Sequence, residues 1–240
     1  MVEDEKMNNI IRIIENRHST RAPFTDKNVS KEDIMHIIEA ARWAPTAHNM
    51  QNFEITVIDD KKLIDKIGKI KSPPSEEFIR ENFQQLSMSE SELKKKKVGI
   101  LGANFPASWR DAARLDEAVK DMAPAPLSYT IKNSPCILIV TYDKRKRAPA
   151  SKGDILGFLS LGCAMENMWL MAESLGIGFQ IMSVFSGKDV SEEMKKILNV
   201  PPYMDIAYAV RLGYAPDMKY LRVRRDAKDF TYHNMFGKRF

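Results

Sequence analysis

The feature that most restricts the fold is an uninterrupted apolar run, CILIV, at positions 136–140. A strand with one face in water alternates apolar and polar side chains, whereas such a run is typical of a strand buried on both faces. The segment at about 154–175 is apolar and long enough for a helix, and Gly176 follows it as a typical helix terminator. We therefore expect a sheet whose central strand is covered on both faces, together with one long core helix.

The side chains of this helix predicted to form its apolar face include Leu156, Leu159, Met165, Met168, Trp169 and Met171.

Other helices are predicted from helical spacing and capping residues. One covers about residues 5–16, with apolar side chains at Met7, Ile10, Ile11, Ile13 and Ile14. A second follows Ser30, which with Asp33 resembles a capping box, and its apolar stripe contains Ile34, Ile37, Ile38 and Ala41. A short helix is expected at about 60–70, and another in SEEMKKIL, begun by Ser191.

Three more strands are expected in NFEITVIDD, with Phe53, Ile55 and Val57 facing inward, in IGFQIMSVF, and in DIAYAVRLGYA. Residues 71–130 show little periodicity, and we interpret them as an irregular excursion over the core and a candidate lid. Neither an internal repeat nor a linker is evident. The sequence thus predicts a single α+β domain, residues 1–240, with a mixed central β-sheet surrounded by helices.

Composition argues against a membrane, secreted or metal-binding protein. No window approaches the roughly 18 consecutive apolar residues of a membrane helix, and the N-terminus lacks a signal-peptide pattern, so we expect a cytoplasmic protein without a membrane partner. The two cysteines, Cys136 and Cys163, lie in apolar segments and are predicted to be buried free thiols. The four histidines form no metal-binding pattern, and no metal site is expected.

The formal net charge of +5 derives largely from KKKK at 94–97 and KRKR at 144–147. Such runs can follow nucleic-acid phosphates, but they more often lie on solvated surfaces, and neither run is interleaved with aromatic residues. We therefore expect no nucleic-acid partner and keep a non-catalytic nucleic-acid-binding protein as an alternative.

The stretch RHSTR at 17–21 follows the first predicted helix. In an extended segment Arg17, Ser19 and Arg21 point to one side, and His18 and Thr20 to the other. Guanidinium groups bind phosphate in a bidentate manner, and a serine hydroxyl adds a donor, so the pattern suits a phosphorylated ligand. The alternative is a surface turn whose arginines pair with helix carboxylates such as Glu15.

A second stretch, AARWAPTAHNMQNFEI, closes the helix that follows Ser30. Its small-residue loop, Ala44 to Ala47, would let the backbone approach a planar ring closely. The amides of Asn49 and Gln51 could then contact the edge of such a ring.

In this order the two stretches resemble the flavin-binding N-terminus of the nitroreductase family. The resemblance continues through GDILGFLSLGCAMENMWLMAESLGIGFQIMSVF, LNVPPYMDIAYAVRLGYAP and the basic RVRRDAKDF, and covers roughly residues 10–60 and 130–230. It implies a nitroreductase-like fold, an intertwined homodimer with FMN in two interface clefts, and hydride transfer from NAD(P)H through flavin N5 to an electrophilic acceptor such as a nitroaromatic or quinone. The sequence departs from the family pattern at Ala47, Asn52 and Phe53.

Carried over by position, the resemblance implies that Arg17 and Ser19 hold the phosphate and ribityl end, while Arg21 reaches the pyrimidine edge and tunes the flavin. Met182 and Ser183 would lie along the ring near N5, and Arg224 or Arg225 would complete the phosphate site. The other subunit would contribute Pro45, Thr46, Ala47 and Asn49 from its loop. The full set of predicted cofactor-binding residues is Arg17, His18, Ser19, Arg21, Pro45, Thr46, Ala47, Asn49, Met182, Ser183, Arg224 and Arg225.

Within the same fold other chemistry stays open: reductive dehalogenation, dehydrogenation of a heterocycle, or fragmentation of the flavin.

Overall fold

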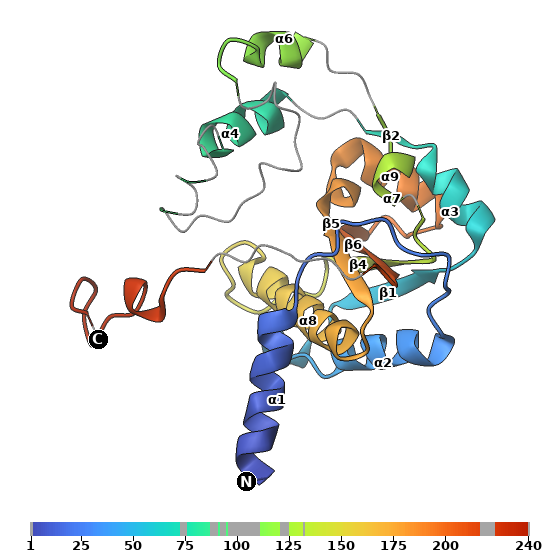
Figure 1. Cartoon of the computed structure of the whole chain (residues 1–240). Helices are drawn as coiled ribbons and strands as arrows, with labels where there is room; N and C mark the ends of the chain where they lie inside the picture. Colours follow the sequence, from blue (N-terminus) through green and yellow to red (C-terminus); the bar gives the residue numbers. More distant parts are fainter. Residues whose placement is uncertain are drawn as a thin grey trace. The chain divides into compact units, whose positions relative to one another are not determined.

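A computed structural model describes residues 2–72, 76–86, 91, 95, 111–120, 125–131, 133–216 and 224–239 (Figure 1). The chain divides into two compact units, Met1–Ser72 with Ala125–Asp217, and Pro73–Pro124 with Met218–Phe240. The first unit contains the sheet and most of the predicted site. The single domain expected from the sequence stays a prediction.

The elements of the first unit, in chain order, are α1 (Val2–Asn16), α2 (Lys31–Arg42), η1 (Ala47–Asn49), β1 (Phe53–Ile58), α3 (Lys61–Gly68), β2 (Lys71–Ser72), β3 (Ala125–Pro126), α7 (Ser128–Ile131), β4 (Cys136–Asp143), α8 (Ile155–Ser174), β5 (Gly178–Met182), η4 (Ser183–Ser186), α9 (Lys188–Ile197) and β6 (Met204–Gly213). Those described in the second unit are α4 (Glu76–Leu86), α6 (Leu115–Lys120) and η5 (Ala227–Asp229).

The main sheet has the strand order β1-β4-β6-β5, and each neighbouring pair is antiparallel. A parallel contact is added where Ser19, after α1, forms an isolated bridge with Phe179 on β5. Along β4 the side chains of Cys136, Leu138 and Val140 join a core cluster with α2 and α8. Those of Ile137 and Ile139 join a second cluster with α3 and α9. The prediction of a central strand buried on both faces is confirmed.

The capping residues predicted for two helix ends are confirmed: Ser30 at the start of α2 and Gly176 after the end of α8. The Ser30 hydroxyl accepts a hydrogen bond from the Asp33 amide at 3.0 Å, which caps α2. Gly176 follows α8 with a φ of +67°, a conformation that glycine adopts at little cost. The predicted start of α9 is wrong, because this helix begins at Lys188 and Ser191 lies inside its first turn.

The predicted core face of α8 is wrong at two positions: Leu156 is 36% exposed and Leu159 is 60% exposed. The buried side of the helix instead contains Gly157, Ser160, Leu161, Ala164, Met168 and Ala172. Because α8 is apolar nearly all round, periodicity does not identify a single face. The small residues pack inward, and several large apolar side chains stay exposed.

Of the described helices, α8 is also the one whose length and apolar composition would suit a membrane span. A core helix of a globular protein passes the same test, and α8 packs against α2 and β5. This packing accounts for the apolar residues of one side of α8, since 33% of the apolar window is buried.

The predicted alternation of β1 fails at its end. Phe53 and Ile55 are half-buried as expected, but Val57 is 37% exposed and Ile58 is 2% exposed. β1 lies at the edge of the sheet, where a strand has a neighbouring strand on one side only. The burial of its side chains therefore does not follow a strict alternation.

The predicted excursion, residues 71–130, leaves the first unit and returns to it at two strands that pair with each other. β2 and β3 pair antiparallel, with Lys71 opposite Pro126 and Ser72 opposite Ala125, close to the predicted limits of 71 and 130. In the second unit, Arg80 on α4 binds Glu76 at 2.7 Å and Asp116 on α6 at 3.0 Å. Of the basic run at 94–97, only Lys95 belongs to the described residues.

Candidate functional site

The site is built around residues 17–25, called here the crossing segment, which passes over β5 and β6 between α1 and α2 (Figure 1). Two backbone hydrogen bonds tie it to the sheet: the Thr20 amide donates to the Phe179 carbonyl at 2.9 Å, and the Thr25 amide donates to the Tyr214 carbonyl at 2.7 Å. The Phe179 amide also donates to the Thr20 hydroxyl at 3.3 Å. The segment is therefore fixed near its middle, at Thr20, and at its C-terminal end, at Thr25.

The predicted alternation is observed in the second half of this segment. Thr20, Ala22 and Phe24 are buried, whereas Arg21 and Pro23 are exposed. Within the described part of the chain, no hydrogen bond or ion pair joins the Arg21 guanidinium to another group. Arg21 thus presents an uncompensated charge at the surface of the sheet edge.

Two glycines allow this close approach. A Cβ atom on Gly213 would lie 2.5 to 2.8 Å from atoms of the Phe24 side chain. A Cβ atom on Gly178 would lie 2.8 Å from the Phe24 ring and 2.9 Å from the Thr20 side chain. Any larger residue at these positions would push the crossing segment off the sheet.

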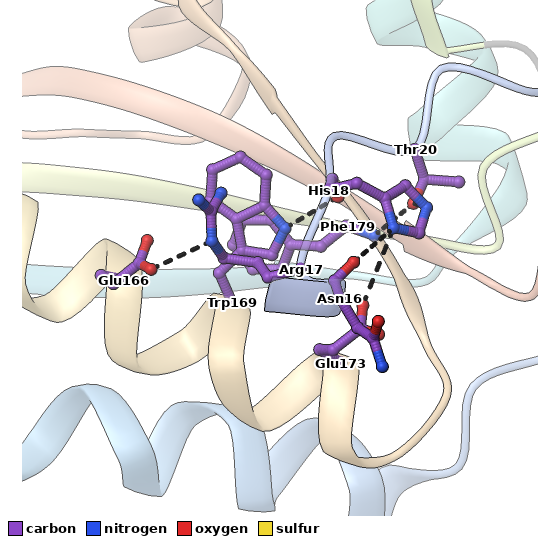
Figure 2. Close-up of polar contacts among 8 residues, drawn as sticks. All are labelled: Asn16, Arg17, His18, Thr20, Glu166, Trp169, Glu173 and Phe179. Atoms are coloured by element: carbon purple, nitrogen blue, oxygen red, sulfur yellow. Dashed lines mark hydrogen bonds and ion pairs between the residues drawn. The ribbon is translucent and has the colours of Figure 1, made fainter. Parts of the chain in front are cut away.

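Arg17 lies against α8. Its guanidinium carbon is 4.4 Å from the centre of the Trp169 ring, and Nε is 3.0 Å from Glu166 Oε1 (Figure 2). The ion pair is not aligned as a hydrogen bond, since Nε is buried and makes none within the described residues. The Arg17 side chain is 20% exposed. The helix therefore holds the guanidinium by stacking and by charge, and Nε carries unused donor capacity.

Trp169 supports this end of the crossing segment in two further ways. Its indole Nε1 donates to the His18 carbonyl at 3.0 Å, and its ring stacks on Phe179 with the centres 5.3 Å apart. Figure 2 shows these groups gathered at one place on α8. The indole thus links α8, β5 and the crossing segment.

The His18 imidazole contacts groups of its own chain. Nδ1 lies 3.0 Å from the Asn16 carbonyl and 3.9 Å from Glu173 Oε2, and Nε2 lies 3.4 Å from the Thr20 hydroxyl. Ser19 is half-buried beside β5. Direct contact of either residue with a cofactor stays a prediction.

The predicted ring-binding loop is held on the N-terminal part of α8. The Ala47 amide donates to the Ser160 hydroxyl at 2.9 Å, and that hydroxyl donates to the Leu156 carbonyl at 2.8 Å. The Gln51 amide donates to the Thr46 hydroxyl at 3.1 Å. These bonds fix the position of the loop.

The same loop has an unusual backbone. His48, Asn49 and Gln51 have φ angles of 51°, 53° and 46°. Non-glycine residues adopt such angles rarely, and clusters of them are found at functional sites. Pro45 and Asn49 are exposed at the surface.

The two predicted halves of the site are anchored at different places on α8. Their contacts on α8, Ser160 and Trp169, are nine residues apart, which corresponds to about 14 Å along a helix axis. The distance is too long for a direct contact between the two anchoring points.

The remaining predicted residues have mixed placements. Met182 ends β5 and is 3% exposed with its side chain in the core, so only its backbone is free to contact a ligand. Ser183 follows at the start of η4 and is exposed. Arg224 and Arg225 are exposed in the second unit, and their part in the phosphate site stays a prediction.

Several residues of this region were missed as site residues. Trp169 was interpreted only as a core residue, and Glu166 and Ser160 were not singled out. Arg211 was missed too, although a signal existed: it is the one charged residue in the apolar stretch IAYAVRLG at 206–213. Arg211 is 4% exposed, and it donates hydrogen bonds to the Thr20 and Ala22 carbonyls.

Other kinds of site have little support. Within the described ranges no group of three or more His, Cys, Asp or Glu side chains could hold a metal ion. Both cysteines are free, and burial, aided by Asp59, raises the pKa of the Cys136 thiol to about 12. Cys136 is therefore a structural thiol, because a nucleophilic cysteine needs a lowered pKa.

Comparisons with known proteins agree with this arrangement. A curated relative from Archaeoglobus fulgidus, whose name marks it as a candidate NADH dehydrogenase or NAD(P)H nitroreductase, is 23% identical over 214 residues, 89% of each chain. The solved nitroreductase of Bacteroides fragilis with bound FMN has a TM-score of 0.56 and 19% identity, covering 93% of this chain and 98% of its own. That of Desulfitobacterium hafniense, also with bound FMN, has a TM-score of 0.57 and 22% identity, covering 93% and 97%.

A family model extends this result from fold to family. The model described as the nitroreductase family matches residues 14–214, a range that includes the crossing segment, the ring-binding loop, α8 and β5. The chain belongs to the nitroreductase family.

Proposed function

We propose that the protein is an FMN-dependent oxidoreductase that transfers hydride from NAD(P)H to an electrophilic acceptor such as a nitroaromatic or a quinone. The observation that carries the proposal is the crossing segment, where Arg17, Ser19 and Arg21 lie on a backbone anchored to β5 and β6. Membership of the nitroreductase family supports it, as do the relatives whose structures contain FMN.

The residues present fit the phosphate of FMN. The Arg17 side chain is 20% exposed and is held from behind by Trp169, so its position is set before a ligand arrives. Glu166 is 42% exposed and makes only a misaligned ion pair, which a phosphate dianion can replace. The hydroxyl of Ser19, two residues after Arg17, would supply a further hydrogen-bond donor to the phosphate.

When bound, FMN would supply hydride transfer at N5, first from NAD(P)H and then to the acceptor, in a ping-pong order. Arg21 would place a fixed positive charge at the pyrimidine edge, where two-electron reduction leaves negative charge. The backbone at Met182 and the Ser183 side chain would line the ring.

A homodimer would complete the site. Ile155, Phe158 and Leu159 on α8 are 59%, 52% and 60% exposed, and the neighbouring α1 exposes Met7, Ile10, Ile11 and Ile14. Exposed apolar side chains on two helices that touch favour an interaction face there. In this homodimer the ring-binding loop, Pro45 to Asn49, would serve the partner's flavin, as membership of the family suggests.

The nucleic-acid alternative is disfavoured by the basic run at 144–147. Lys144 pairs with Asp205 at 3.2 Å and Arg145 with Asp143 at 2.8 Å. Arg147 donates to the Ser151 carbonyl at 3.3 Å and also bonds the Gly153 carbonyl. Two of the four charges are therefore paired with carboxylates of the same chain.

The proposed function is tested by isolating the protein and following its absorbance. We expect yellow protein with flavin bands, bleached by NADH or NADPH under anaerobic conditions and restored by a nitroaromatic or quinone. An acceptor panel then separates this activity from reductive dehalogenation, heterocycle dehydrogenation and flavin fragmentation. Colourless protein that gains no flavin on incubation with FMN would overturn the proposal.

A further inference from the structure

We propose that Arg211, buried in β6, is a positioning residue that fixes the charge of Arg21 at the flavin edge. The inference rests on the proposed function, because it assigns Arg211 a role in tuning a bound flavin. Arg211 itself does not face the proposed ligand: it is 4% exposed and lies beneath the crossing segment.

The contacts of Arg211 bracket Arg21 in the sequence. Nη2 donates to the Ala22 carbonyl at 2.8 Å and to the Thr20 carbonyl at 3.2 Å. Nε donates to Gln180 Oε1 at 2.6 Å, and Gln180 lies directly opposite on β5. One guanidinium therefore binds the carbonyl groups of the residues before and after Arg21, and Gln180 on the neighbouring strand orients it.

Packing reinforces this placement. The guanidinium carbon lies 4.5 Å from the centre of the Phe24 ring, and that ring covers Gly178 and Gly213. Arg211, Phe24 and the two glycines thus hold residues 20–24 in van der Waals contact with the sheet.

Stability alone does not explain a guanidinium at this place. Removing a charge from water is expensive, and apolar residues of similar volume often stabilise a buried site equally well or better. A leucine or methionine, however, could not bond two alternate carbonyl groups. Buried ionic groups can instead serve specificity, and here the guanidinium fixes the backbone before and after Arg21.

The register has a direct consequence for charge. Side chains of an extended segment alternate between faces, so a slip by one residue would turn Arg21 inward and Ala22 outward. In the observed register Phe24 packs on Gly178 and Gly213 and Arg21 is exposed. The bonds from Arg211 to the Thr20 and Ala22 carbonyls hold the backbone in that position.

Arg211→Lys tests the inference, because an ammonium group keeps the charge but lacks the planar fork that serves both carbonyls and Gln180. The measured quantity is the two-electron midpoint potential of bound FMN. Arg21→Ala should lower this potential, and Arg211→Lys should lower it in the same direction. In the Arg21→Ala background, Arg211→Lys should cause no further shift, because its effect passes through Arg21.

The FMN-free protein provides a second measurement, hydrogen exchange at the Thr20 and Thr25 amides. Arg211→Lys should speed exchange at both, since the segment between them loses its central anchor. Arg42→Lys on α2 is the matched control, a surface arginine paired with Glu39, and should change neither the potential nor the exchange. If Arg211→Lys does not fold, Gln180→Ala takes its place, with a smaller shift in the same direction expected.

The outcomes are distinguishable. Wild-type protein that binds no FMN would reject the proposed function. An FMN-binding protein whose potential is unchanged by Arg211→Lys, or by Gln180→Ala where the lysine variant does not fold, would overturn the positioning role. A shift of equal size with and without Arg21 would overturn it too, since Arg211 would then act on the flavin directly.

Discussion

At the scale of single residues, aromatic and glycine positions decide where the charges of the site lie. Arg17 depends on Trp169 of α8 for its platform, and Glu166 of the same helix pairs with its charge. Arg21 depends on β6 through Arg211. The side chains proposed to bind FMN are therefore positioned by elements distant in the sequence, which explains why local pattern found the arginines but not their supports.

Asp143 gives a prediction for stability against pH. It ends β4 with a side chain 8% exposed, and hydrogen bonds from Arg145 lower the pKa of its carboxyl from 3.8 to about 2. A group whose pKa is lower in the folded state stabilises that state above its ordinary pKa, and loses this contribution as the pH falls through the folded value.

Asp143→Asn should therefore lower the midpoint of urea unfolding at neutral pH, and the difference from wild type should shrink as the pH falls from about 4 to about 2. Unfolding titrations across this range provide the measurement. A difference independent of pH would contradict the assignment of the stabilisation to the ionised carboxylate.

At the scale of elements, close packing at β5 and β6 can be tested with glycine substitutions of opposite sign. Gly213→Ala should destabilise the protein by about 1–3 kcal/mol, because the new Cβ would overlap the Phe24 side chain. It should also weaken FMN binding, since the crossing segment would move.

Gly162→Ala is the matched control within α8, made in a Leu159→Glu background because residue 162 shares the exposed helix face of Ile155, Phe158 and Leu159 and would otherwise lie in the proposed interface. A Cβ atom there would meet nothing within 4 Å in the chain, so replacing a helix-interior glycine should stabilise the protein by about 0.5–1 kcal/mol. Denaturant unfolding of both variants gives the signs. Equal effects would show that the crossing segment does not press on Gly213.

Elements whose local chemistry and packing agree could be predicted from the sequence. Ser30 caps α2, Gly176 ends α8, and the CILIV run is buried on both faces, because each signal depends on neighbours in the chain. The inward face of α8 could not be predicted, since Leu156 and Leu159 are as apolar as the residues that are buried. There, small side chains at Gly157, Ser160 and Ala164 set the packing.

For the candidate site, the sequence predicts the residues that would bind the ligand but not the residues that hold them in place. The arginines and the ring-binding loop were identified because their residue types carry the chemistry. The ties from Ser160 to Ala47 and from Arg211 to Ala22 span 113 and 189 residues, so only the folded chain brings them together.

At the scale of the whole molecule, the proposed homodimer predicts the effect of a charge on α8. Leu159→Glu changes a side chain that is 60% exposed, so the fold of one chain should tolerate it within about 0.5 kcal/mol. A buried charge at the interface should nevertheless convert the dimer to a monomer, as measured by light scattering after size exclusion.

The same variant should bind FMN more weakly, because each proposed site takes a loop from the partner. Val57→Glu on the β1 edge, at a side chain 37% exposed, serves as the control and should stay dimeric with FMN bound. Dimeric Leu159→Glu protein with normal FMN affinity would place the interface elsewhere.

The most direct measurement of the central proposal, that Arg17 and its neighbours bind a phosphorylated flavin, is equilibrium titration of the FMN-free protein with FMN and with riboflavin. We expect FMN to bind more tightly, and Arg17→Ala to weaken FMN binding by about 1.5–3 kcal/mol, the scale of a charge-assisted hydrogen bond, while riboflavin affinity changes little. Equal affinities for the two flavins, or an FMN affinity that Arg17→Ala leaves unchanged, would contradict it.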